Sequence, residues 1–80
     1  MHYKTHLFMD KKKAFGNRLK ELRNKKKMTQ AQLSQESGID RTFIAHIEAG
    51  SKNVTIETMG FLFQGLGVTY NYFFSSGEFS

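Results

Sequence analysis

The chain has 80 residues, of which 39% are apolar, with a formal net charge of +5 and neither cysteine nor proline. A chain of this length builds one compact core, which excludes a second domain and a large enclosed catalytic pocket, and the lack of cysteine excludes disulfides and thiolate chemistry. No segment has the apolar length of a signal peptide or a membrane span, so we expect a cytoplasmic protein with no membrane partner.

The N-terminal part of the chain is predicted to contain an arm and a long helix. We expect residues 1–9 to form a flexible arm. Asp10 can cap the first helix, which should run to about Lys26. The apolar face of this helix, surrounded by Lys and Arg, consists of Phe15, Leu19 and Leu22.

A second, short helix is predicted from its start signal. Thr29 and Gln32 have the spacing of a capping box, in which each residue satisfies a free backbone N–H of the other. Leu33 is the main buried residue of this helix. Gly38 follows soon afterwards and supplies the positive φ that a tight turn between helices often needs, so the helix should end before it.

A third short helix is predicted from Asp40, which can cap it, to about Ala49, with Gly50 as its stop. Ile44 and Ile47 share the inner face of this helix at a period of 3.6 residues. The opposite face is polar and small, and it consists of Thr42, His46 and Ala49.

The C-terminal part is predicted to contain two further helices. Thr55 begins the fourth helix, Gly67 ends it, and its expected inner face consists of Ile56, Met59, Leu62, Phe63 and Leu66. Thr69 can cap a fifth helix, Tyr70–Phe74, and we expect residues 75–80 to form a polar tail that frays. The sequence therefore predicts an all-α fold with one domain over residues 10–74.

The second and third helices have the pattern of a helix-turn-helix, whose second helix enters the major groove of DNA. Arg41 and Thr42 stand at the N-terminal end of that helix, where side chains meet base edges, and His46 stands one turn further along. Residues 1–27 contain ten Lys or Arg and two acidic residues, an imbalance that attracts polyanions. Solvated helix surfaces have the same composition, so charge alone leaves the partner open.

From Phe15 to Phe74 the sequence resembles the XRE, Cro and lambda-repressor superfamily. The stretch MTQAQLSQESGIDRTFIAHIEAGSKNVTI, residues 28–56, contains the Thr-Gln pair, the Gly turn and the aliphatic residues before a Glu and a Gly that are typical of it. Within the superfamily, residues 40–44 and 51–56 are similar to controller proteins of restriction-modification systems. The resemblance implies a compact five-helix, lambda-repressor-like domain that forms a homodimer and binds a double-stranded DNA operator of two half-sites.

The resemblance also implies roles for individual residues. The implied base readers are Arg41, Thr42 and His46, although His46 on a polar helix face could equally be solvated. The implied backbone or groove contacts are Thr29, Gln30, Phe43, Ser51, Lys52 and Asn53. Arg23 and Glu48 are implied as a partly buried, structural ion pair that fixes the reading helix against the scaffold.

The C-terminal part of the chain is rich in aromatic residues and holds seven of the eleven. Such a surplus is typical of an interface, and a symmetric dimer matches a palindromic operator. A larger single core is the alternative. The residues expected in the dimer interface are Phe61, Tyr70, Tyr72, Phe73 and Phe74.

The sequence contains no plausible catalytic constellation, and we expect neither enzyme activity nor a cofactor. His2 and His6 have the spacing of a metal-binding pair on a helix, but no carboxylate or thiolate completes the set. The leading hypothesis is a regulator of transcription, with RNA polymerase as a candidate further partner. The alternative is an antitoxin-like protein-interaction module in which DNA binding is secondary.

Overall fold

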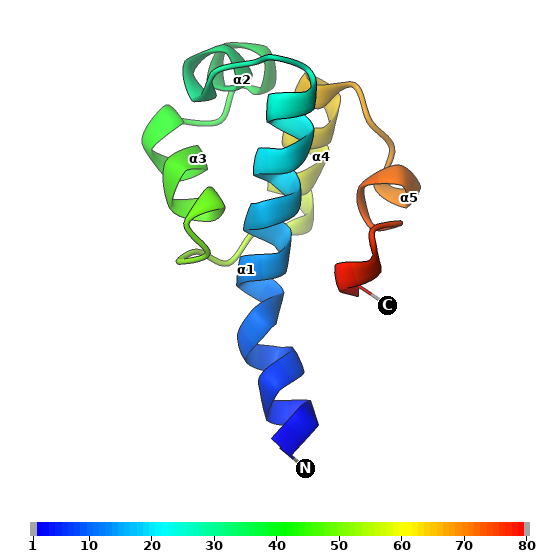
Figure 1. The fold of residues 1–80 in the computed structure, drawn as a ribbon. Coiled ribbons are helices and arrows are strands. Elements are labelled where there is room, and N and C mark those ends of the chain that lie inside the picture. The colour runs from blue at the N-terminus through cyan, green and yellow to red at the C-terminus, as the bar shows by residue number, and fades with distance from the viewer. Residues whose placement is uncertain (1, 80) are drawn as a thin grey trace.

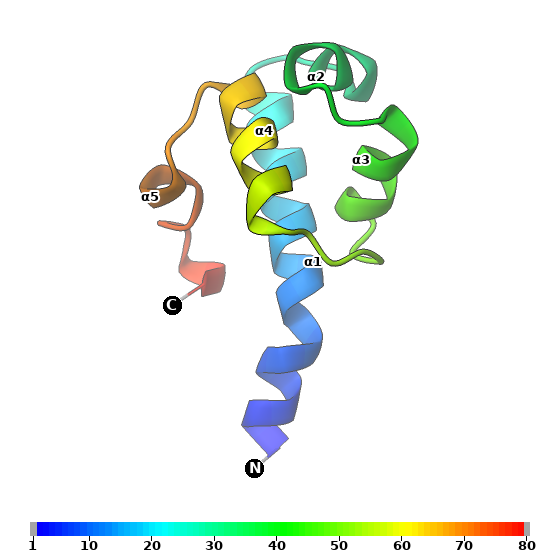
Figure 2. The ribbon, with the colours of Figure 1, turned by 180° about the vertical axis from the view of Figure 1, so that it is seen from behind.

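The computed structural model describes residues 2–79, with side chains for residues 11–79, and every regular element in this part of the chain is helical. The elements are α1 (His2–Lys25), α2 (Gln30–Ser37), α3 (Arg41–Glu48), α4 (Ile56–Leu66), α5 (Tyr70–Phe73) and the short 3-10 helix η1 (Gly77–Phe79). Helix α1 runs through the middle, with α3 on one side, α5 on the other and α2 near its C-terminal end (Figure 1). Helix α4 crosses the back of α1 (Figure 2). The expected all-α fold with five α-helices is confirmed.

One core joins all five α-helices. Its centre is aromatic, because the Phe73 ring lies 4.7 Å from the Phe15 ring and 4.4 Å from the Phe63 ring, measured between centroids. Burial of apolar side chains, together with ring packing of this kind, is the largest favourable contribution to the folding free energy of a small domain. The buried apolar side chains are Phe15, Leu19, Leu22, Leu33, Ile44, Ile47, Leu62, Phe63, Leu66 and Phe73.

Helix α1 begins at His2, well before Asp10, so the expected helix start at Asp10 was wrong. Residues 2–15 contain neither Gly nor Pro, and nothing in them interrupts the backbone hydrogen bonds of a helix. The first half of α1 projects away from the other helices, which gives the molecule its extents of 41 × 23 × 22 Å (Figure 1). Met1 and the side chains of residues 1–10, including those of His2 and His6, lie outside the described residues.

The C-terminal residues up to Phe79, where we expected a polar tail, contain the short helix η1. Phe79 of η1 packs against the edge of the core, with its ring centroid 6.0 Å from Phe73 and 5.0 Å from Phe74. Burial of one aromatic ring is enough to order a short polar segment around it. Ser80 lies outside the described residues.

The burial of two apolar side chains differs from the prediction. Ile56 was expected on the inner face of α4 but is 74% exposed, because it lies in the first turn of α4, where no described segment covers it. Phe73 was expected in the dimer interface but is 0% exposed, so its side chain belongs to the core of the single chain. Helical periodicity predicts the direction of a side chain but not what lies there.

Candidate nucleic-acid interface

Local hydrogen bonds set α2 and the turn after it. The Thr29 hydroxyl accepts a hydrogen bond from the backbone N–H of Gln32 at 3.0 Å, and the Gln32 side chain accepts one from the Thr29 N–H at 2.8 Å. The expected capping box is therefore present. Gly38 ends α2 with a φ of 78°, a left-handed conformation that residues with a Cβ rarely adopt.

Asp40 fixes the N-terminal end of α3. Its carboxylate accepts hydrogen bonds from the backbone N–H groups of Thr42 at 3.0 Å and Phe43 at 3.2 Å. These bonds satisfy donors that a helix end otherwise leaves free. Ile44 and Ile47 are buried on the inner side of the same helix, so α3 can present only its outer side to a ligand.

The outer side of α3 is open to solvent. Arg41 and Thr42 are exposed in its first turn, and His46 and Ala49 are exposed further along. Within residues 11–79, the side chains of Arg41 and His46 form no hydrogen bond with another residue. A helix with a free polar face of this kind fits the major groove, where a guanidinium can bind guanine bidentately.

The Arg23 side chain of α1 holds the other end of α3. Its Nε donates to Glu48 Oε2 at 2.7 Å and its Nη2 donates to Glu48 Oε1 at 2.9 Å, while its Nη1 donates to the Met28 carbonyl at 2.6 Å. The Glu48 side chain is only 4% exposed. The hydrogen bond with Glu48 raises the pKa of Arg23, more than burial lowers it, and keeps the guanidinium charged.

Gln30 also hydrogen-bonds to Glu48, a contact that the sequence did not predict. The resemblance implied a phosphate contact for Gln30, and its Nε2 donates to Glu48 Oε1 at 3.0 Å. A side-chain amide has a second N–H, which a phosphate can still accept from. Glu48 therefore links the end of α3 to both α1 and the first turn of α2.

The other residues expected at the DNA backbone lie around α3. Thr29 is exposed before α2, and Ser51, Lys52 and Asn53 are exposed in the loop that follows α3. The Ser51 hydroxyl donates to the His46 carbonyl at 3.0 Å, which fixes the loop to the end of α3. Phe43 is half-buried and packs against the core.

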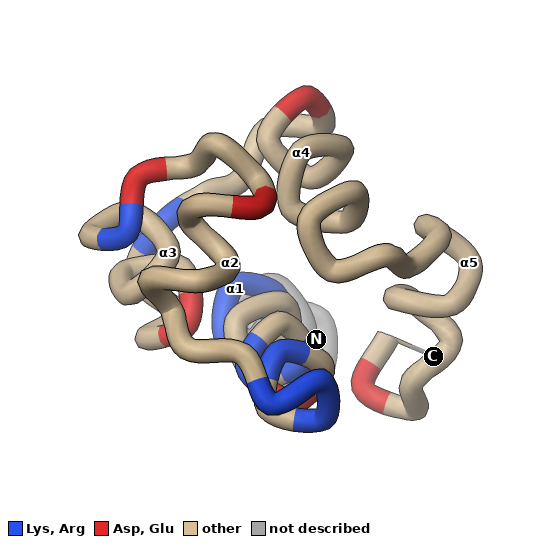
Figure 3. The backbone as a smooth tube through the Cα atoms, turned by 90° about the horizontal axis from the view of Figure 1, so that it is seen from above, with Lys and Arg blue, Asp and Glu red and all other residues tan. Residues whose placement is uncertain are grey.

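Basic residues gather mainly along α1 (Figure 3). The three lysines at positions 11–13 line an open groove of about 970 Å³ together with Lys52. The Lys13 side chain lies against Gly50. The fold therefore brings these three lysines of α1 next to the loop that follows α3.

Arg18 is a buried residue of α1 for which the sequence predicts no individual role. It is 6% exposed, and its guanidinium donates to the carbonyls of Phe73 and Tyr72 at 2.8 Å each. Its position three residues after Phe15 and four before Leu22 puts it beside the apolar face of α1. That spacing places Arg18 at the edge of the buried face, but it does not indicate which group the guanidinium binds.

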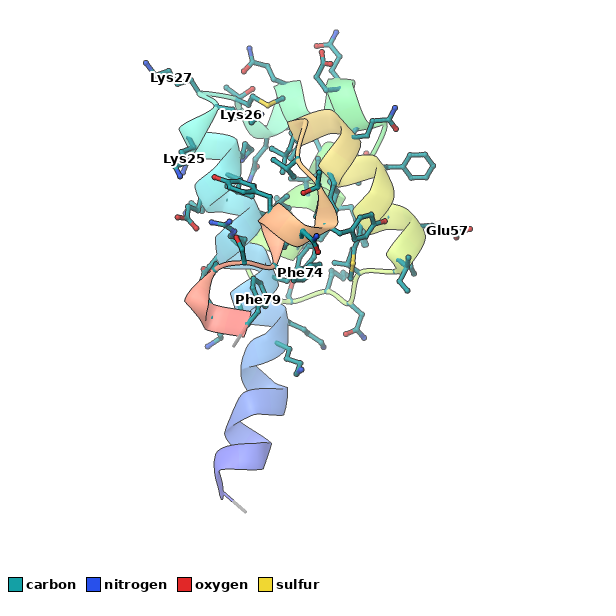
Figure 4. All side chains as sticks on the ribbon, turned by 90° about the vertical axis from the view of Figure 1, so that its right-hand side faces the viewer. Lys25, Lys26, Lys27, Glu57, Phe74 and Phe79 are labelled. Carbon is teal, nitrogen blue, oxygen red and sulfur yellow. The ribbon has the colours of Figure 1, made fainter. Side chains whose placement is uncertain are left out.

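The exposed apolar side chains lie on α4 and α5. Tyr70 and Tyr72 are each 46% exposed, Phe61 is 53% exposed, and the Tyr70 hydroxyl donates to the Ile56 carbonyl at 3.4 Å. Figure 4 views this side of the molecule, with Phe74 at the foot of α5, Lys25–Lys27 on one side and Glu57 on the other. This α4–α5 face is suited to contact with another protein surface.

The described residues contain neither a metal-binding cluster nor a membrane-spanning helix. No group of three or more His, Asp or Glu side chains there has the geometry to hold a metal ion. None of the described helices combines the length and apolarity needed to cross a membrane.

The helices described above lie in a segment that matches a known protein family. Residues 16–76 match the helix-turn-helix domain family. The control protein C.MunI of a Mycoplasma species is 37% identical over 70 residues, which cover 86% of this chain and 95% of that protein.

Solved structures of two controllers are similar to this fold. The restriction-modification controller protein C.Esp1396I, as a tetramer in complex with its natural 35 base-pair operator, is 36% identical with a TM-score of 0.77, and the match covers 80% of this chain and 84% of that chain. The controller C.AhdI from Aeromonas hydrophila is 33% identical with a TM-score of 0.76, and the match covers 79% and 96% of the two chains.

Proposed function

The chain belongs to the helix-turn-helix domain family, and on this premise we propose that it is a cytoplasmic, sequence-specific regulator of transcription that binds double-stranded DNA as a homodimer. Its similarity to restriction-modification controllers supports a role in controlling its own restriction-modification operon. The role is regulatory rather than enzymatic. RNA polymerase is a candidate further partner, since a regulator bound at a promoter lies close to it.

One observation carries the proposal: α3 presents a free polar face while both of its ends are fixed. Asp40 orders the first turn with Arg41 and Thr42, and Glu48 holds the last turn. Rigid placement of this kind is what base readout requires, because a contact to a base edge depends on the position of the side chain. Arg41, Thr42 and His46 are the proposed base readers.

The proposed backbone contacts surround this face. Thr29 and Gln30 stand at the N-terminus of α2, and Gln30 contacts Glu48 at the end of α3. The loop residues Ser51, Lys52 and Asn53 follow the same end of α3. Such contacts set the register of a protein on the duplex without reading sequence. Phe43, which is half-buried, is proposed as an apolar groove contact.

The proposed dimer forms through the α4–α5 face. A single module reads few base pairs, and two copies related by a two-fold axis place their reading helices about 34 Å apart on the DNA. The exposed side chains of Phe61, Tyr70 and Tyr72, together with Ile56, are the available anchors, and the half-buried Phe74 lies beside them.

Selection of bound duplexes from a random pool, followed by binding titrations at several salt concentrations, tests this function. We expect a two-fold symmetric consensus and an affinity that falls steeply with salt for all sequences. A pool that shows no enriched sequence, together with a stable hetero-complex formed through the α4–α5 face, would instead support the antitoxin-like alternative.

A further inference from the structure

Arg18 of α1 is a buried cation, and within residues 11–79 no buried carboxylate lies beside it. Its acidic neighbour among these residues, Glu21, lies 3.1 Å away and has a side chain that is 52% exposed. A buried charge is costly unless hydrogen bonds compensate it. Here the compensation comes from main-chain carbonyls, because Arg18 Nε donates to Phe73 and Nη2 donates to Tyr72.

These two carbonyls belong to the C-terminal end of α5, which has four residues. A helix this short is not stable by itself, and the carbonyls at its C-terminal end carry partial negative charge. The Tyr72 carbonyl also accepts from the hydroxyl of Ser75 at 2.7 Å. A guanidinium donates hydrogen bonds to these carbonyls, and its positive charge offsets their partial negative charge. The Arg18 guanidinium also lies 5.2 Å from the centre of the Tyr72 ring, within the range of a cation–π contact, so it holds the backbone and the ring of that residue together.

The core alone does not fix the orientation of α5. Phe73 anchors the helix by burial. The rings of Tyr70 and Phe74 also pack against Phe63, with centroid distances of 4.8 and 6.0 Å. Apolar contacts of this kind are largely non-directional. The two hydrogen bonds from Arg18 are directional, and they fix the orientation of α5 relative to α1. The exposed ring of Tyr72 takes its direction from them, whereas the Tyr70 ring also packs edge-on against Phe63 at 4.8 Å.

Helix α1 holds the reading helix in a similar manner, through Arg23. Arg18 and Arg23 stand five positions apart in one helix, a rise of about 7.5 Å. One arginine fixes α5, which carries part of the α4–α5 face, and the other fixes α3, which carries the base readers. Helix α1 therefore acts as a rigid spacer between the surface for a second copy and the surface for DNA.

We propose that Arg18 is a positioning residue that sets the spacing between the two half-sites, by fixing the direction of α5 relative to α3 in each subunit. The inference rests on the proposed dimeric regulator. Without Arg18, α5 keeps its apolar contacts with the core, but hydrogen bonds to α1 no longer hold its C-terminal end in one direction. The dimer then weakens, and the angle between the two reading helices is no longer defined.

The test uses the full chain with Arg18→Gln, Arg18→Lys and the control Lys20→Gln, which removes the same charge from an exposed position of α1. Binding is titrated on a single half-site, on the full operator, and on operators whose spacer is longer or shorter by a base pair. For Arg18→Gln we expect unchanged half-site affinity, a loss of about tenfold or more on the full operator, and weaker discrimination between spacers. Lys20→Gln should keep the spacer preference of the unmodified protein. The spacer preference of Arg18→Lys should lie between that of Arg18→Gln and that of the unmodified protein.

Hydrogen exchange separates positioning from general destabilisation. The positioning role predicts faster exchange for amides of residues 72–75 in Arg18→Gln, with protection unchanged in α1 to α4. Equal losses on half-site and full operator, with exchange raised throughout, would mean that Arg18 only stabilises the fold and would overturn the inference. An unchanged spacer preference would overturn it as well, whereas an unmodified protein that does not dimerise or select a sequence would overturn the proposed function itself.

Discussion

The Arg23 guanidinium and the Glu48 carboxylate are joined side by side by hydrogen bonds of 2.7 and 2.9 Å, which tie α1 to the last residue of α3. Both side chains are almost completely buried. In this arrangement, loss of either partner leaves an uncompensated charge away from water.

Glu48→Ala should therefore lower the free energy of unfolding by about 3–5 kcal/mol, since it strands the Arg23 charge. Glu48→Gln should cost less, because its amide oxygen still accepts a hydrogen bond. Denaturant unfolding at a fixed protein concentration measures both variants. Glu57→Ala, which removes an exposed acid from α4, is the control and should change stability by no more than about 0.5 kcal/mol. Near-zero effects of both Glu48 variants would contradict a stabilising pair.

Arg41→Ala should weaken binding to the operator by about 1–3 kcal/mol per half-site and relax the preference at one base pair, because a bidentate contact to guanine is lost. Titration against every single-base variant of the operator measures this directly. If the base preference of the variant is unchanged, Arg41 is not a base reader.

Lys52→Gln should weaken binding to all sequences alike and reduce the slope of log affinity against log salt by about 1, as expected for loss of one phosphate contact. The same titrations, repeated from low to high salt, provide the slope. A change in base preference would assign Lys52 to readout instead, and an unchanged slope would remove it from the backbone contacts.

Phe73→Ala and Phe61→Glu should separate the core from the dimer face. The first variant removes a ring that is 0% exposed and should destabilise the chain by about 3–5 kcal/mol. The second places a charge at an exposed position and should leave a folded monomer, because an unpaired charge disfavours burial against a second copy. Circular dichroism and sedimentation distinguish the two results. A Phe61→Glu protein that dimerises normally would place this residue outside the interface.

Gly65→Ala should destabilise the protein by about 1–3 kcal/mol even though alanine is the better helix former. A Cβ at this position would stand 3.0 Å from the Ser37 backbone nitrogen and 2.9 Å from its Cβ, so α2 and α4 would have to separate. Gly60→Ala is the matched control in the same helix, because its Cβ would meet only the Tyr70 hydroxyl, at 3.2 Å. Thermal unfolding of the two variants should show the larger loss at Gly65, and a gain in stability at Gly65 would contradict the close contact.

The sequence by itself determined the elements around the proposed site. Thr29, Asp40 and Thr55 begin their helices as predicted, and Gly38 ends α2, because caps and turns depend on hydrogen bonds between residues close in the chain. The outer face of α3 follows from the 3.6-residue period, which also places Ile44 and Ile47 inward. The Arg23–Glu48 pair could be predicted only from the resemblance, because its members are 25 residues apart and no local pattern relates them.

Only the tertiary structure decided which apolar and charged side chains are buried. Ile56 and Phe73 lie on helices that were predicted correctly, yet one is exposed and the other is in the core, because burial depends on which distant element arrives at each face. Arg18 reads as one more surface cation until the end of α5, 55 residues later, supplies the carbonyls that it binds. Contacts across such separations leave no local pattern in the chain, since the partners are brought together by packing of the core rather than by the helix that carries them.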